Sequence, residues 1–274
     1  AVLLWCAAAP RSDSELLSLA KFARVYNDRL VTDVTRESVH TALGFCKTAG
    51  TYTRYRTMIA AILNAAKQEG WLREVPKLVV RTDKKTKPRK WLTHEEWVRL
   101  YAELPKHMKP MAQFAVETGL RQANVLGLTW SRVDLARKLV WVEGSEMKSG
   151  DALAVPLSQG ALDVLRGQVG QDVEFVFTYR GKPIKEIKTA FQAACIRAGV
   201  GRNLCAADGK LAGYEGFTWH GLRHTWATWH VQAETPLDVL QKLGGWSDLR
   251  MVMNYSHHSA GHLAQFADNA RRKK

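Results

Sequence analysis

One ten-residue segment constrains the fold of this chain more than any other feature. RTDKKTKPRK, residues 81–90, contains six basic side chains and one acidic side chain around a proline, without periodic apolar positions. Such a segment has nothing to bury, and its charges would lose their hydration in a core, so it is typical of a linker. The sequence therefore predicts two domains, residues 1–80 and residues 91–274, joined by a basic linker.

The first predicted domain is helical. SDSELLSLAKFARVYND begins with Ser and Asp capping residues, which indicate the start of one helix. TYTRYRTMIAAILNAAKQEGWL spaces Ile59, Ile62 and Leu63 along one face of a second helix, which ends at Gly70. We therefore expect residues 12–72 to form helices.

The start of this second helix carries aromatic and cationic side chains. Cations beside the outward N–H groups of a helix start suit a phosphate backbone. A solvated helix start with Tyr55 packed inward fits the same pattern equally well. The candidate DNA contacts in this helix and in the linker are Tyr52, Arg54, Arg56, Lys84, Lys85, Lys87, Arg89 and Lys90.

The second predicted domain begins with a capping box, in which Thr93 is followed three residues later by Glu96. KPMAQFAVETG is a helix that stops at Gly119, and LRQANVLGL adds a further helical turn. The β-branched runs KLVWVEG and ALAVPL flank the turn-rich SEMKSGD, which predicts a hairpin. Further helices are expected at residues 158–169, 186–199, 220–231, 236–242 and 248–255. The predicted fold class is mainly α with a small antiparallel β-sheet (α+β).

The charge of the chain narrows the choice of partner. Its 274 residues include 40 Lys and Arg against 26 Asp and Glu, a net charge of +14. Residues 1–90 alone contain 17 basic and 8 acidic side chains. Such a balance favours nucleic acid or an anionic membrane as the partner, although a basic surface without a specific partner is a rival interpretation. Because no segment reaches transmembrane length, we expect DNA and no membrane.

Cysteine usage and the first residues bear on the compartment. Cys6, Cys46, Cys195 and Cys205 are scattered without a CxxC pair, which favours a reducing compartment such as the cytoplasm and argues against zinc. The opening AVLLWCAAAP lacks an initiator Met and a basic flank, so it fits a piece of a longer chain better than a signal peptide.

Polar side chains stand at several breaks between the predicted elements. Arg121 follows a helix end, Lys148 lies at the hairpin tip, and His220 and Arg223 lie one turn apart at a helix start. These four groups could converge on one anion. Two arginines can hold the extra charge of a five-coordinate phosphorus without a metal ion.

The carboxylates and tyrosines of the chain indicate whether it could cleave a phosphate ester with metal ions or with a tyrosine nucleophile. Glu143, Glu146 and Asp151 cluster around one hairpin and are typical of turn residues, so a two-metal nuclease is poorly supported. We therefore expect no metal and no cofactor. A nucleophile is still required, and Tyr255 in MVMNYSHH is the candidate, although a lone tyrosine near a C-terminus is more often a core residue.

Taken together, these segments resemble the tyrosine recombinase family of the phage-integrase type. The resemblance rests on TGLRQANVLGL at Arg121, the hairpin residue Lys148, HGLRHT at His220 and Arg223, and LGGWSDLRMVMNY, in which Trp246 precedes Tyr255 by nine residues. It implies a helical N-terminal core-binding domain before the catalytic domain. It also implies double-stranded DNA attachment or recombination sites as the partner.

The resemblance further implies a mechanism. Tyr255 would attack a DNA phosphorus to give a 3′-phosphotyrosyl link and a free 5′-hydroxyl. Arg121 and Arg223 would bind the nonbridging oxygens, His220 would serve in proton transfer at the tyrosine, and Lys148 would protonate the leaving oxygen. Trp246 would be supportive rather than catalytic. Members act as a homo-tetramer on two paired duplexes, so we expect mainly monomer without DNA and DNA-bending accessory proteins as further partners.

Two positions depart from the family pattern or extend it. Asn124 stands where many members have an acid, so a carboxylate that orients Arg121 would come from elsewhere. His224 fits a supporting role at the site and a core position equally well. Two other functions share the sequence features: a type IB topoisomerase, and a catalytically inactive DNA-binding regulator, which would not need to retain all the residues of the mechanism.

Overall fold

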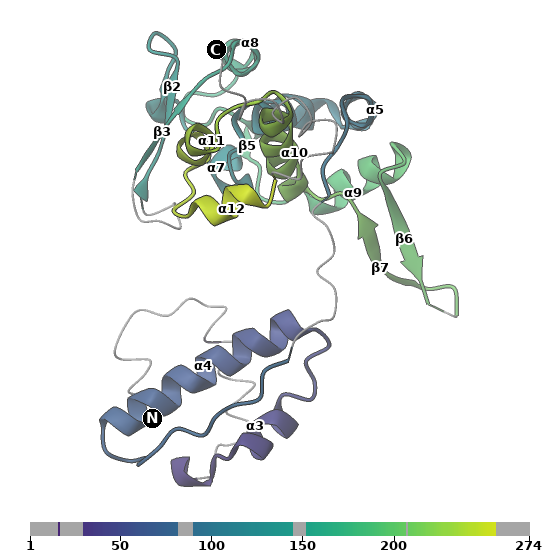
Figure 1. The fold of residues 1–274 in the computed structure, drawn as a ribbon. Helices are drawn as coiled ribbons and strands as arrows, with labels where there is room; N and C mark the ends of the chain where they lie inside the picture. The colour runs from purple at the N-terminus through teal and green to yellow at the C-terminus, as the bar shows by residue number, and fades with distance from the viewer. Residues whose placement is uncertain (1–15, 17–29, 82–89, 145–151, 207, 256–274) are drawn as a thin grey trace, which may run out of the picture. The chain divides into compact units, whose positions relative to one another are not determined.

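The structure is a computed structural model that describes residue 16 and residues 30–81, 90–144, 152–206 and 208–255 (Figure 1). The chain divides into two compact units, Ala1–Lys87 and Pro88–Lys274. In the described ranges, no helix combines the length and the apolar character needed to cross a membrane.

The described part of the first unit is helical. It contains the short 3-10 helix η1 (Val31–Asp33) and the helices α3 (Arg36–Ala42) and α4 (Ala49–Gln68). Thr35 and Ser38 form a capping box at α3, and α4 ends just before Gly70, whose φ is 76°. The prediction of a helix that ends at this glycine is confirmed. The predicted helix in SDSELLSLAKFARVYND lies outside the described residues, apart from residue 16.

The core of the first unit forms between α3 and α4. Ile59, Ile62 and Leu63 of α4 share a buried cluster with Val39 of α3 and with Leu43, which caps the end of α3. The apolar face read from the sequence therefore faces this core, as helical spacing requires.

The aromatic side chains at the start of α4 also belong to this core. Tyr52 is 1% exposed and its hydroxyl lies 3.0 Å from Nδ1 of His40, while Tyr55 is 6% exposed. The prediction that Tyr52 contacts DNA is corrected accordingly, because a ring so deeply buried serves packing. The inward position of Tyr55 agrees with the second interpretation of this helix start. Arg54 on the same turns is exposed, and Arg56 is half-buried.

The second unit opens with a helical layer. It consists of α5 (His94–Glu103), η2 (Lys106–Met108), α6 (Lys109–Thr118) and α7 (Gln122–Leu126). Thr93 and Glu96 form the predicted capping box at α5. α6 is almost wholly buried, with Met111 and Phe114 inaccessible to solvent, because α8 and α10 both pack against it.

The predicted hairpin is present as part of a three-stranded sheet. η3 (Trp130–Arg132) leads into β1 (Val133–Asp134), which pairs with β2 (Leu139–Val142), and β2 pairs with β3 (Leu153–Pro156), all antiparallel. Val140 lies opposite Val155 and both are buried. The hairpin tip, with Lys148, Glu146 and Asp151, lies outside the described residues.

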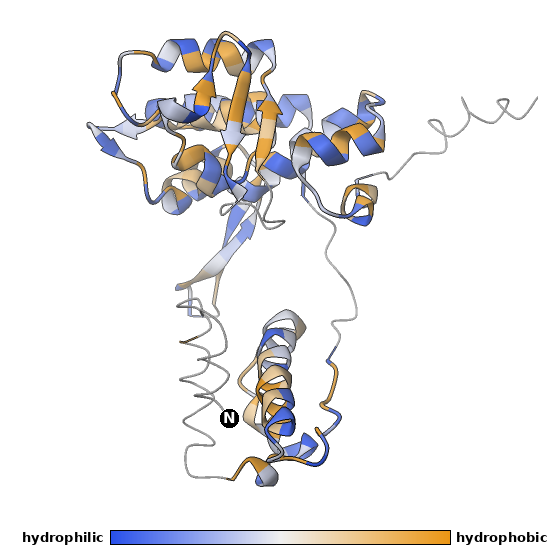
Figure 2. Cartoon of the chain, turned by 90° about the vertical axis from the view of Figure 1, so that its left-hand side faces the viewer, coloured by the Kyte–Doolittle hydropathy of each residue, from blue (hydrophilic) through white to orange (hydrophobic). Residues whose placement is uncertain are grey.

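Two further hairpins follow that the sequence analysis did not predict. After α8 (Gln159–Gln168) come β4 (Thr178–Tyr179) and β5 (Lys182–Pro183), and after α9 (Lys188–Arg197) come β6 (Gly201–Cys205) and β7 (Leu211–Gly216). The strands β6 and β7 project beyond α9 (Figure 1), and hydrophilic and apolar residues are mixed along them (Figure 2). Without an apolar face they lack the alternation from which strands are predicted. The α+β class is confirmed, with more β-structure than expected.

The described part of the second unit ends with three helices that build the site. They are α10 (Trp219–Gln232), α11 (Leu237–Gly244) and α12 (Leu249–Met253), in the order predicted. α10 packs on α6 and α11, and α11 packs on α12. Trp226, Trp246, Val252 and Tyr255 are buried together where these helices meet.

Candidate active site

The site is organised around the break between α6 and α7. Gly119 ends α6 in the left-handed region, with φ of 64°, and a side chain there would collide with the indole of Trp226 on α10. Glycine satisfies both requirements. The chain then turns so that Arg121, half-buried, becomes the N-cap residue of α7.

Arg223 is held between the ends of two helices. Its side chain is 4% exposed; Nη1 donates to the carbonyl of Gly119 at 2.6 Å, and Nη2 donates to the carbonyl of Gly244 at 2.5 Å. These carbonyls lie at the C-terminal ends of α6 and α11, where unpaired carbonyl groups carry partial negative charge. The two bonds fix the plane of the guanidinium in the interior of the unit.

The indole ring of Trp246 packs against this guanidinium. The centre of the Arg223 guanidinium lies 4.3 Å from a ring centroid of Trp246, a cation–π arrangement. Trp246 is 7% exposed and its ring passes over Gly244, where a side chain would collide with it. Its position agrees with the predicted supporting role, because it packs against the cation.

The electrostatics of the site favour an anion. The pKa of Arg223 is lowered to about 10, mainly by burial and secondly by the charge of Arg121, while Tyr255 opposes the shift. Arg223 therefore stays charged at neutral pH, where the charge of Arg121 repels it. A bound anion would relieve the repulsion between the two arginines.

The hydroxyl of Tyr255 is hydrogen-bonded to a histidine. Tyr255 is 7% exposed, and its Oη lies 2.7 Å from Nδ1 of His224 on α10. The ring centroid of His220, one turn earlier, lies 4.6 Å from that of His224, and His220 is exposed. The sequence analysis gave His220 the proton transfer at the tyrosine; in the structure, His224 lies at hydrogen-bond distance from the hydroxyl. The spacing of these two histidines, i and i+4 on one helix face, could have indicated this pair.

Four segments of the second unit thus contribute the site residues Arg121, His220, Arg223, Trp246 and Tyr255. Lys148 lies outside the described residues, as do Lys84, Lys85, Lys87 and Arg89. Their predicted roles stay predictions.

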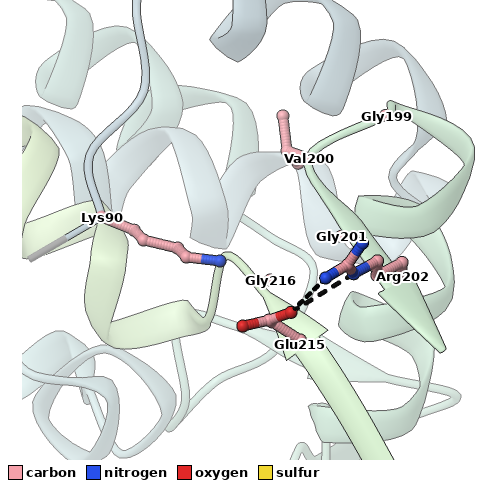
Figure 3. Close-up of a pocket in the computed structure, with 7 residues that line it drawn as sticks. All are labelled: Lys90, Gly199, Val200, Gly201, Arg202, Glu215 and Gly216. Atoms are coloured by element: carbon pink, nitrogen blue, oxygen red, sulfur yellow. Dashed lines mark hydrogen bonds and ion pairs between the residues drawn. The ribbon is translucent and has the colours of Figure 1, made fainter. Parts of the chain in front are cut away.

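Lys90 lies at the edge of a groove rather than at this site. The groove has a volume of about 520 Å³ and is lined by Lys90, Arg202, Glu215 and glycine backbone at the base of the β6–β7 hairpin (Figure 3). The ammonium of Lys90 points across the groove toward Glu215. Arg202 already pairs with Glu215 at 2.7 Å, which offsets the carboxylate charge and leaves the groove basic.

Asn124 is buried on the first turns of α7, three residues after Arg121. It is 6% exposed, and its Nδ2 has no hydrogen-bond partner within the described part of the chain. The expected carboxylate partner of Arg121 stays a prediction. Across the described ranges, no three His, Cys, Asp or Glu side chains are grouped so that they could hold a metal ion.

Comparisons with known proteins found similar sequences. Residues 90–262 match the model of the phage integrase family. The chain is 35% identical over 217 residues to the integrase of Salmonella phage P22, a match that covers 79% of this chain and 56% of that protein. It is 30% identical over 146 residues to the tyrosine recombinase XerD of Lacticaseibacillus casei, covering 53% of this chain and 48% of that protein.

Solved structures share the fold. The Tn1549 transposon integrase in complex with transposon right end DNA has a TM-score of 0.77 at 16% identity, covering 98% of this chain and 97% of that chain. A lambda integrase dimer bound to a core site has a TM-score of 0.71 at 20% identity, covering 90% of this chain and 93% of that chain.

The fold is therefore that of a recombinase catalytic domain preceded by a helical unit. Because the family match covers more than half of the sequence, the chain belongs to the phage integrase family, and the resemblance read from its motifs is confirmed. The chain spans about half the length of the curated relatives that it matches.

Proposed function

We propose that this chain is a tyrosine site-specific recombinase that cuts and rejoins DNA strands through a 3′-phosphotyrosyl intermediate. The observation that carries the proposal is the buried guanidinium of Arg223, fixed by the carbonyls of Gly119 and Gly244 in a cluster with the Tyr255 hydroxyl. A cation so fixed is preorganised for an anion that acquires further charge during reaction.

The proposed reaction has two transesterification steps. In the first, Oη of Tyr255 attacks a DNA phosphorus, while Arg121 and Arg223 bind the nonbridging oxygens and Lys148 protonates the departing 5′-oxygen. A histidine of α10 takes part in proton transfer at Tyr255. In the second step, a free 5′-hydroxyl from another duplex attacks the phosphotyrosyl link and restores the backbone. The energy of the phosphodiester is kept in the tyrosyl ester, so the reaction needs no nucleotide cofactor.

The partner in this proposal is double-stranded DNA carrying attachment or recombination sites. The net charge of +14 supports a polyanion. So do the two solved structures with the same fold, one in complex with transposon end DNA and the other bound to a core site. Residues 1–80 would act as the core-type DNA-binding domain, residues 81–90 as a basic linker and residues 91–274 as the catalytic domain.

Three further features belong to the proposal. The recombinase would integrate or excise a phage or another mobile element inside a bacterial cell, as the names of its relatives suggest. It would be mainly monomeric alone and tetrameric on two paired duplexes, with DNA-bending proteins as accessory factors. Relatives named integrase and tyrosine recombinase favour this function over a topoisomerase, and the full set of predicted site residues favours it over an inactive regulator.

Peptide mapping of a trapped intermediate tests the proposal. On a suicide substrate nicked near the cleavage position, the protein should form a covalent DNA adduct at Tyr255, in EDTA as well as in Mg²⁺. Tyr255→Phe keeps the ring and its packing, so this variant should bind DNA but form no adduct. An adduct at another residue, or cleavage that disappears in EDTA, would overturn the mechanism.

A further inference from the structure

The hydrogen bond between His224 and Tyr255 joins two packed side chains. His224 is half-buried in the second turn of α10. Tyr255 is 7% exposed and packs beside Trp246, and the ring centroids of Tyr255 and Trp246 are 5.8 Å apart. Nδ1 of His224 and Oη of Tyr255 are 2.7 Å apart, a distance typical of a strong hydrogen bond. The packing on both sides keeps the hydroxyl aimed at one ring nitrogen.

The tautomer of His224 sets the direction of this bond. A neutral histidine donates from one ring nitrogen and accepts at the other. With its proton on Nε2, His224 accepts at Nδ1 from the hydroxyl of Tyr255. In that tautomer the pair consists of a neutral acceptor and a protonated nucleophile.

We propose that His224 is the proton acceptor for Tyr255 during strand cleavage, an inference that rests on the function proposed above. As Oη bonds to phosphorus, its proton moves to Nδ1 of His224, and the bond from phosphorus to the 5′-oxygen breaks. The 5′-oxygen takes its proton from a different group, Lys148. In the rejoining step the imidazolium of His224 returns its proton to the departing oxygen of Tyr255.

Charge balance supports this step. The bound phosphodiester brings one negative charge, and the five-coordinate state adds a second that comes from the tyrosine oxygen. The imidazolium formed on His224 then lies beside that charge instead of facing Arg121 and Arg223 alone. His220 is exposed and in edge contact with the His224 ring.

The rate of adduct formation on the nicked substrate, measured with the full chain, tests the inference. His224→Asn keeps a hydrogen-bonding group near the position of Nδ1 but cannot take up a proton at neutral pH. Both His224→Asn and His224→Ala should cleave about 10²-fold more slowly or worse, as expected for removal of a general base. Added imidazole should restore part of the rate of His224→Ala but none of the rate of Tyr255→Phe.

His230→Asn is the matched control. His230 lies on the same helix and its Nδ1 bonds Thr235 Oγ1 at 3.0 Å, away from Tyr255, so this variant should cleave at the wild-type rate. A substrate with sulfur in place of the bridging 5′-oxygen separates base from acid, because a thiolate leaves without a proton. That substrate should correct Lys148→Ala and leave His224→Asn slow.

The outcomes separate the two proposals. Wild-type cleavage by His224→Asn, or full correction of its defect by the bridging sulfur, would overturn the assignment of His224 while the wild-type adduct at Tyr255 stands. A wild-type protein that forms no adduct at Tyr255 would instead refute the proposed function.

Discussion

Replacing Gly119 with alanine should destabilise the second unit in two separable ways. Alanine in the left-handed region costs about 1–2 kcal/mol, and Gly119 has φ of 64°. The new methyl group would also overlap the indole of Trp226, and overpacking of a filled core costs about 1–3 kcal/mol. The free energy of unfolding should therefore fall by about 2–5 kcal/mol, the sum of these two ranges.

Gly170 offers a control for the backbone contribution. Its φ is 81°, and a side chain there would meet no described atom within 4 Å. Gly170→Ala should therefore reduce the free energy of unfolding by only about 1–2 kcal/mol. The difference between the two variants isolates the contact with Trp226.

Urea unfolding followed by tryptophan fluorescence measures both variants, because eight of the ten tryptophans follow residue 90. Gly119→Ala should also slow DNA cleavage, since Trp226 and Trp246 have ring centroids 5.9 Å apart and Trp246 supports Arg223. An equal decrease of stability in Gly119→Ala and Gly170→Ala would refute the packing argument. Unchanged cleavage by Gly119→Ala would refute the link from Trp226 to the site.

Two further predictions concern DNA binding and the arginines. Replacing Arg54, Arg56 and the basic residues of 84–90 with alanine should weaken DNA binding uniformly. The slope of log binding constant against log salt concentration should become shallower by about one unit for each DNA phosphate that is no longer neutralised. Arg166→Ala is the control and should leave the slope unchanged, because Arg166 pairs with Asp163 at 3.2 Å. An unaltered slope in the neutralised protein would mean that these residues only solubilise the surface. Arg121→Ala and Arg223→Ala should each reduce adduct formation by about 10²-fold or more, whereas Trp246→Phe, which keeps a ring under the guanidinium, should reduce it less. Comparable reductions in all three variants would give Trp246 a larger role than support.

Elements with strong local signals were predictable from the sequence. The capping box at Thr93, the stop at Gly119 and the apolar face of α4 each act within one or two helical turns, so the residues that cause them are neighbours in the sequence. The hairpin of β2 and β3 was predictable because its buried valines alternate with more exposed positions.

The β4–β5 and β6–β7 hairpins were missed for different reasons. Arg180 and Gly181, between β4 and β5, both have positive φ, as a two-residue hairpin turn requires, but arginine is not a typical residue for such a turn. The strands β6 and β7 pair through their backbones while their side chains are exposed or half-buried. Backbone pairing without an apolar face leaves no periodic pattern in the side chains.

The sequence by itself determined the family, the class of chemistry and the residues from which a phosphate site could be built. It could do so because the motifs around Arg121, Arg223 and Tyr255 keep their order and spacing along the chain. Only the tertiary structure decided how those residues meet. The carbonyls that hold Arg223 belong to Gly119 and Gly244, and no side-chain pattern marks a carbonyl as a partner. Tyr52, a candidate DNA contact by sequence, is buried in the core, and the packing of α10 and α12 places Tyr255 beside His224. Such contacts between distant segments depend on how whole helices dock.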